Sequence, residues 1–122
     1  MHRLLIPALL ALALTGALTR NAEAHSGLAR SIPAAGSTVS PAPTEVVLSF
    51  TEKLEPKFSS IEVKDAKGAQ VHDGKASVDP AHPAQMRVAL KALPPGTYKV
   101  IWRVLSVDTH RTQGSFTFRV GR

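Results

Sequence analysis

The sequence contains no cysteine, and this absence excludes disulfide bonds, thiolate metal sites and a cysteine nucleophile. Metal sites without thiolates use nitrogen and oxygen ligands, which suit Cu(II), Ni(II) or Zn(II) better than Cu(I). Methionine is almost as scarce, because Met1 and Met86 are the only two in the sequence. A cluster of soft thioether ligands is therefore not expected either.

The sequence also lacks a hydrophobic run of the roughly 20 residues that a membrane-spanning helix needs. Its apolar run from Leu4 to Leu14 follows a basic start and precedes small residues that end at Ala24. This order is typical of a cleaved secretory signal peptide. We therefore expect residues 1–24 to be removed on export to the periplasm. Residues 25–122 would then form one domain, without membrane insertion and stabilised by core packing alone.

No run of basic residues occurs, although the sequence carries 15 Lys and Arg against 9 Asp and Glu. Nucleic-acid-binding proteins usually show clustered basic residues and a recognisable module, and neither is present in this sequence. The scattered charges predict a solvated surface of mixed sign and no nucleic-acid partner. The sequence also lacks a Gly-x-Ser-x-Gly nucleophile motif and a phosphate-binding glycine loop, so it does not predict an enzyme.

Helical periodicity is absent from the sequence beyond the first 24 residues, and alternating apolar residues predict strands instead. In the strongest pattern, residues 98–105 place Trp102 at the centre of one apolar face, where we expect the middle of the core. About seven short strands separated by turns indicate an all-β antiparallel sandwich of immunoglobulin-like or cupredoxin-like type. Two segments, 72–83 and 107–113, are expected to be loops, the first around one short strand. The strands are predicted at 28–32, 45–51, 60–65, 69–71, 86–90, 98–105 and 115–120.

Asp108-Thr109-His110, in the second of these loops, is a candidate metal-binding motif. In extended backbone, residues two apart point to the same side, so Asp108 and His110 can present a carboxylate and an imidazole to one point. A loop-capping pair is the alternative reading of this short motif. Cleavage after Ala24 would add a second imidazole, because the mature chain would begin with His25. Its free α-amine, with a pKa of about 7.7–8.0, and its ring Nδ1 could chelate one metal ion near neutral pH.

An amine, two imidazoles and a carboxylate form a set that suits tetragonal Cu(II). Glu52, at the end of the predicted strand 45–51, has two readings. It is either a solvated charge or a carboxylate that binds the metal axially or orients a ligand. His72 and His82 have no second ligand at metal-like spacing, so they are expected to be solvated or structural. Met86 is expected in the core.

Several spaced motifs occur together in one order along the chain. They are His25 at the expected mature start, then SIPAAGS at 31–37, LSFTEKL at 48–54, LPPGTYKVIWRV at 93–104 and SVDTHRTQGSFTF at 106–118. The set resembles the CopC family of periplasmic copper-binding, copper-resistance proteins over essentially the whole predicted mature chain.

The resemblance implies a Greek-key β-barrel or sandwich that binds one Cu(II) with very high affinity. By position, His25 would supply its amine and imidazole, His110 a second imidazole and Asp108 a carboxylate. Glu52 matches the family's nearby acidic residue, which acts as a ligand or beside one. Some family members also bind Cu(I) through a Met-rich loop, but residues 66–84 contain no Met. A single Cu(II) site is therefore predicted.

The resulting hypothesis is a monomeric periplasmic Cu(II) protein that sequesters copper or delivers it to a CopD-type inner-membrane transporter. Two other classes stay open at this point. An N-terminal His chelate with a second His is also the copper arrangement of lytic polysaccharide monooxygenases, which are oxidative enzymes. An immunoglobulin-like interaction module, with histidines that bind no metal, is the third.

Overall fold

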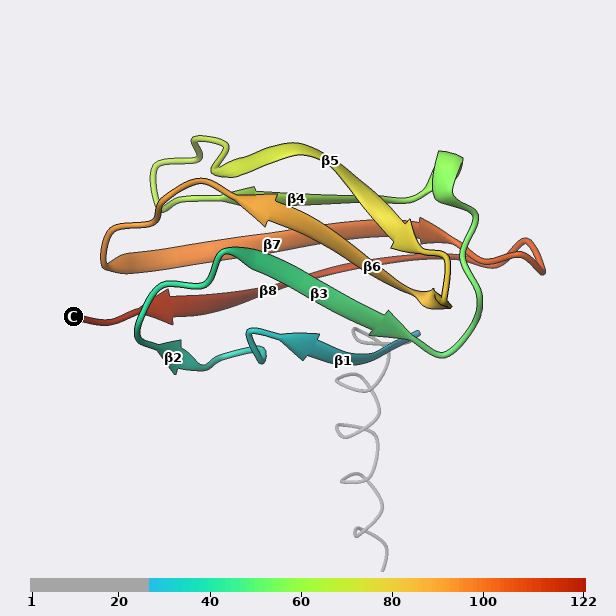
Figure 1. Cartoon of the computed structure of the whole chain (residues 1–122), viewed down its shortest axis with the longest axis horizontal. Helices are drawn as coiled ribbons and strands as arrows, with labels where there is room; N and C mark the ends of the chain where they lie inside the picture. Colours follow the sequence, from blue (N-terminus) through green and yellow to red (C-terminus); the bar gives the residue numbers. More distant parts are fainter. Residues whose placement is uncertain (1–26) are drawn as a thin grey trace, which may run out of the picture.

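The computed structural model describes residues 27–122, which form two β-sheets packed face to face (Figure 1). The predicted signal peptide, residues 1–24, and His25 lie outside the described residues. The prediction of an all-β sandwich is confirmed, and the sheets do not close into a barrel. Within the described part of the chain, no helix is long and apolar enough to cross a membrane.

Each sheet has four strands among the described residues, and neighbouring strands are antiparallel except for the parallel pair β2 and β8. The connections pass from one sheet to the other several times, as in Greek-key sandwiches. The first sheet contains, in spatial order, β1 (Leu28–Ile32), β3 (Glu45–Phe50), β6 (His82–Leu90) and β5 (His72–Asp79). The second sheet contains β2 (Thr38–Val39), β8 (Arg111–Val120), β7 (Gly96–Leu105) and β4 (Ser60–Lys64).

The core lies between the sheets and is built from the alternating apolar residues of both. Trp102 on β7 is 1% exposed, and its ring meets Phe50 of the other sheet edge-to-face at 5.2 Å between centroids. Met86 is fully buried on β6, as predicted. Opposite Trp102 on β8 lies Gly114, so the strand leaves room for the indole ring. Burial of these large side chains provides the main stabilisation of a domain without disulfides.

The segment 72–83 is not the long loop that the sequence predicts. It forms β5, a tight turn, and the start of β6. The prediction was wrong because Gly74 and Pro80 were taken as ends of regular structure. In fact Gly74 has a φ of +76° within an irregular stretch of the β5–β6 pairing, and Pro80 lies in the turn. Most residues of β5 are polar because it is an edge strand with one solvated side.

One end of the sandwich collects four segments that are distant in the sequence (Figure 1). They are the start of β1, the chain that leaves β3, the β5–β6 turn and the β7–β8 loop. The β7–β8 loop is shorter than predicted, because β8 already begins at Arg111. This end of the molecule carries the candidate site.

Candidate metal centre

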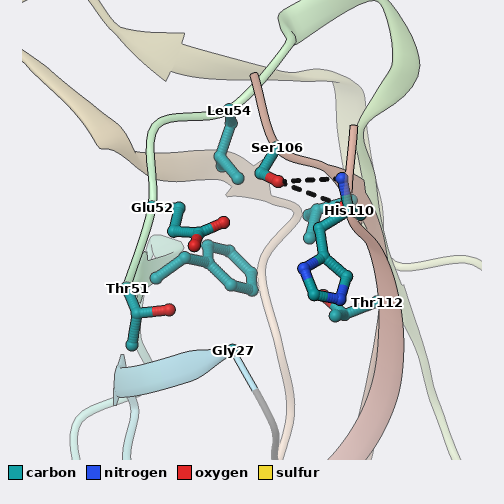
Figure 2. Close-up of a pocket in the computed structure, with 9 residues that line it drawn as sticks. Gly27, Thr51, Glu52, Leu54, Ser106, His110 and Thr112 are labelled. Atoms are coloured by element: carbon teal, nitrogen blue, oxygen red, sulfur yellow. Dashed lines mark hydrogen bonds between the residues drawn. The ribbon is translucent and has the colours of Figure 1, made fainter. Parts of the chain in front are cut away.

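Three acidic or imidazole side chains meet at this end of the sandwich. One ligand atom from each of Glu52, Asp108 and His110 lies within 4.8 Å of the others, and all three residues are exposed. Glu52 follows β3 of one sheet, whereas Asp108 and His110 belong to the β7–β8 loop of the other. Figure 2 shows the Glu52 carboxylate and the His110 ring directed into the same hollow.

Backbone pairing between the two segments fixes Glu52 beside the loop. Leu54 forms an isolated antiparallel bridge with Ser106. On either side of it, Val107 N–H donates to the Lys53 carbonyl at 2.9 Å, and Glu55 N–H donates to the Leu105 carbonyl at 2.8 Å. The chain that leaves β3 is thus held along the end of β7. This pairing places Glu52 one residue before the paired segment, at the side of the loop that carries Asp108 and His110.

Ser106 organises the β7–β8 loop from within. It is 5% exposed, and its hydroxyl donates to Asp108 Oδ1 and accepts the His110 N–H at 3.2 Å. The Ser106 N–H donates to the His110 carbonyl at 2.9 Å, which closes the loop. Ser106 belongs to the motif at 106–118, but the sequence predicted no role for it. A buried serine two residues before the acid of an Asp-x-His motif is the signal that could have indicated one.

The backbone of the loop is a tight turn and not the extended segment assumed from the sequence. Thr109, between the two candidate ligands, has a φ of +71°, a conformation that is costly for a β-branched residue. Its N–H donates to the Ser106 carbonyl at 2.8 Å. Asp108 and His110 therefore converge because of this turn and not because of strand alternation.

The electrostatics of the three side chains favour a bound cation. The hydrogen bond from the Ser106 hydroxyl holds the pKa of Asp108 below its usual value, so this carboxylate stays ionised at neutral pH. A second carboxylate, Glu52, lies within 4.8 Å of it. Two close carboxylates repel each other, and a divalent cation between them relieves that repulsion.

A hollow of about 140 Å³, which we call the ligand pocket, opens between the sheets beside these side chains. Gly27 lies at its edge, where its carbonyl accepts the Thr51 N–H at 2.9 Å. Glycine suits this position for two reasons: its φ is +93°, and a Cβ atom would lie 3.2 Å from Thr112 Oγ1. The pocket is lined by Gly27, Phe50, Thr51, Glu52, Leu54, Val104, Ser106, His110 and Thr112 (Figure 2).

The other two described histidines do not join this group, in agreement with their predicted structural or solvated roles. His72 lies at the start of β5, where its Nδ1 accepts the Val63 N–H of β4 at 3.0 Å. It therefore links the neighbouring edges of the two sheets. His82 is exposed, and its Nδ1 lies 3.4 Å from Asp79 Oδ2. Within residues 27–122, neither histidine belongs to a cluster of three potential ligands.

Comparisons with known proteins give a consistent result. The model of the CopC domain family matches residues 28–121. Copper resistance protein C of Escherichia coli is 40% identical over 118 residues, which cover 88% of this chain and 93% of that protein. The crystal structure of CopC from Methylosinus trichosporium OB3b has a TM-score of 0.73 and 34% identity, and the match covers 80% of this chain and 94% of that one.

A third relative is longer than this chain. Copper transport protein CutJ of Bacillus subtilis is 30% identical over 106 residues, which cover 86% of this chain but 20% of CutJ. A domain similar to this chain is therefore one part of a larger transport protein in that organism.

Proposed function

The chain belongs to the CopC family, and from that premise we propose that it is a periplasmic copper carrier with one Cu(II) site per chain. The observation that carries the proposal is the convergence of Glu52, Asp108 and His110 at the end of the sandwich. In this proposal, residues 1–24 are removed on export and residues 25–122 form the copper-binding domain, which acts as a monomer. Copper is the cargo, and the chemistry is ligation without turnover.

The proposed ligands are the α-amine and imidazole of His25, the imidazole of His110 and the carboxylate of Asp108. The position of Gly27 at the edge of the ligand pocket supports the ligand role that we propose for His25. His25 precedes Gly27 by two residues, and two residues span at most about 7 Å. An N-terminal histidine is therefore within reach of the pocket once the preceding residues are removed.

The choice of Cu(II) rests on the chemistry of the donor set. Nitrogen and oxygen donors in a tetragonal arrangement favour Cu(II), whereas Cu(I) prefers thioether and thiolate sulfur. The one methionine among the described residues, Met86, is fully buried in the core and offers no sulfur to the pocket. Glu52 brings a second negative charge, so that two carboxylates balance the charge of one divalent ion. We propose that Glu52 either binds the copper axially or acts through its charge alone.

Two of the relatives described above are named for copper resistance and for copper transport. The chain is not an enzyme. These names support a role in sequestering copper or in handing it to a transport protein. CutJ, in which a similar domain is part of a longer copper transport protein, supports the second role. A CopD-type inner-membrane transporter is the partner that we propose.

Competition titration against a Cu(II) chelator tests this function. The mature protein should bind one equivalent of Cu(II), and mass spectrometry should show that it begins at His25. His110→Ala should lower the affinity by about a hundredfold or more, since a ligand is lost, while His82→Ala is the matched control and should leave it unchanged. Weak or non-stoichiometric binding, or equal effects of the two substitutions, would refute the proposal.

A further inference from the structure

We propose that the outer face of β7 and β8 is the docking surface for an acidic segment of the protein that exchanges copper with this chain. The identity of that partner rests on the function proposed above. We call the docking surface the basic face, and its cationic side chains are Lys99, Arg103, Arg111 and Arg119.

Strand register gathers these four side chains on one surface. In β7 and β8, the buried residues alternate with exposed ones, so Lys99 and Arg103 point away from the core, as do Arg111 and Arg119. The two strands pair directly, with Lys99 opposite Thr117 and Arg103 opposite Gln113. Residues spread over much of the last quarter of the chain thus form one patch.

The patch has almost no internal counter-charge. In the described part of the chain, ion pairs are made by Lys64, His82 and Arg87, and none by the four cations of the basic face. Glu62, on the neighbouring strand β4, is the one acidic residue whose strand position faces this side, and it pairs with Lys64 at 3.9 Å. Unpaired charges of one sign raise the local potential and attract a partner of opposite sign.

An exposed aromatic ring lies at one end of the patch. Phe58, at the end of the 3₁₀ turn η2 (Pro56–Phe58), is 61% exposed and lines a hollow together with Arg103, Arg111 and Gln113. The Ser59 hydroxyl accepts the Leu105 N–H at 3.1 Å, which holds this turn against the end of β7. The hollow, which we call the outer hollow, combines an exposed apolar ring with the side chains of two arginines. Guanidinium groups bind carboxylates through paired hydrogen bonds.

The cargo itself does not explain this charge. Residues 25–122, the proposed copper-binding domain, have 13 Lys and Arg against 8 Asp and Glu, and this positive excess repels a free divalent cation and opposes its capture. The basic side chains of a copper carrier therefore favour an anionic binding partner in addition to the copper ion. Side-chain hollows and an exposed phenylalanine favour a peptide segment with acidic and apolar side chains over a flat anionic lipid surface.

The position of the outer hollow fits an exchange of copper. Val104 and Thr112 line both the outer hollow and the ligand pocket, so the two lie on opposite sides of the same β-hairpin end. The loop with Asp108 and His110 closes that hairpin. A segment seated against Phe58 and Arg103 would hold its parent protein beside the copper site without covering the ligands.

The test uses a short glutamate-rich peptide with a central leucine as the probe, and NMR of the isotopically labelled, copper-free protein as the measurement. The same peptide with glutamine in place of glutamate controls for charge. We expect salt-sensitive chemical-shift changes confined to residues of the basic face and η2. The double variant K99E/R103E should weaken binding about tenfold or more, and Phe58→Ser should weaken it less.

The matched control is K75E/K91E, which reverses two exposed charges on or next to the first sheet. It should retain binding within about twofold. Equal losses in the two double variants would show a response to net charge alone and would overturn the proposal, as would the absence of peptide binding. Stronger binding of phosphatidylglycerol vesicles than of the peptide, through the same residues, would assign the face to a membrane and also overturn it. Copper titration of K99E/R103E reports on the proposed function separately and should match the unmodified protein.

Discussion

The two sides of the β7–β8 hairpin end differ sharply in charge. On the inner side, the ligand pocket contains Glu52 and His110, with Asp108 next to them. On the outer side, the hollow beside Phe58 contains two arginines and no acidic lining residue. The two strands that separate these sides are a single layer of backbone. A small domain can therefore hold the proposed cation site and the proposed docking surface close together without their charges neutralising each other.

The first sheet gives a second contrast with the basic face. There, Arg87 pairs with Glu45 at 3.2 Å and with Asp79 at 3.7 Å, so the charge of this arginine is balanced within the chain. The outer face of the first sheet thus holds an arginine that is paired within the chain, whereas the cations of the basic face form no ion pair among the described residues.

Loss of the negative charge of Asp108 should have the largest effect on the charge difference between the two sides of the β7–β8 hairpin. Asp108→Asn keeps the shape of the side chain but removes a proposed ligand, so Cu(II) affinity should fall by more than about a hundredfold. Binding of the acidic peptide to the basic face should stay unchanged. Chelator competition and NMR titration measure the two properties on one sample. A loss of both would show that the two sides of the hairpin are one site.

Ser106→Ala should have a smaller effect on copper but a clear effect on stability. The substitution removes the hydroxyl that binds Asp108 and the His110 N–H, and it should lower Cu(II) affinity about tenfold. A buried hydrogen-bonded group is lost, so the free energy of unfolding should fall by about 1–2 kcal/mol. Urea denaturation of the metal-free protein measures this change. Unchanged copper affinity would show that the loop keeps its shape without the serine.

Gly27→Ala changes no proposed ligand. It tests the ligand role proposed for His25 separately from the roles of Asp108 and His110. The new methyl group would meet Thr112, and the positive φ would be strained by about 1–2 kcal/mol. If His25 is a ligand as proposed, Cu(II) affinity should fall about tenfold. The matched control is Gly68→Ala, which has a similar φ but no heavy atom within 4 Å of the added Cβ. Equal copper affinities in the two variants would exclude the N-terminal segment from the site.

The smallest expected effect is on stability and concerns Asp79 on the first sheet. The Ala81 N–H lowers the pKa of Asp79, with His82 and Arg87 contributing less. A lowered pKa in the folded state stabilises the protein above the unfolded pKa of about 3.9, and this contribution is lost as the pH falls through the folded value. Asp79→Asn should therefore be less stable than the unmodified protein at neutral pH, with a difference that shrinks below about pH 4. Urea denaturation across this range measures the difference, and a constant difference would contradict the assignment.

The parts of the fold that follow from local pattern were predictable from the sequence. Alternation of apolar residues around Trp102 identified β7 and its buried face, because a half-buried strand has a period of two. The full extent of β5 was not predicted. The sequence indicated only one short strand within a loop at 72–83, because most residues of β5 are polar and its pairing is irregular after Gly74.

The candidate site and the basic face depend on tertiary structure to different degrees. Asp108 and His110 are neighbours in the sequence, but Glu52 joins them through the Leu54–Ser106 bridge, which no local spacing reveals. From the sequence, Glu52 was either a solvated charge or a carboxylate near the metal, and the family resemblance favoured the second reading. The basic face was not predicted at all. Lys99 and Arg119 are far apart in the sequence, and only the pairing of β7 with β8 brings the exposed residues of the two strands onto one surface.

The bridge between Leu54 and Ser106 has a consequence for how the protein discriminates among metal ions. Because the bridge ties the backbone beside Glu52 to the loop of Asp108 and His110 before any ion arrives, the backbone of the proposed site would lose little conformational entropy on coordination. Such a frame would favour an ion whose preferred geometry matches the proposed nitrogen and oxygen donors over one that demands six evenly spaced oxygens.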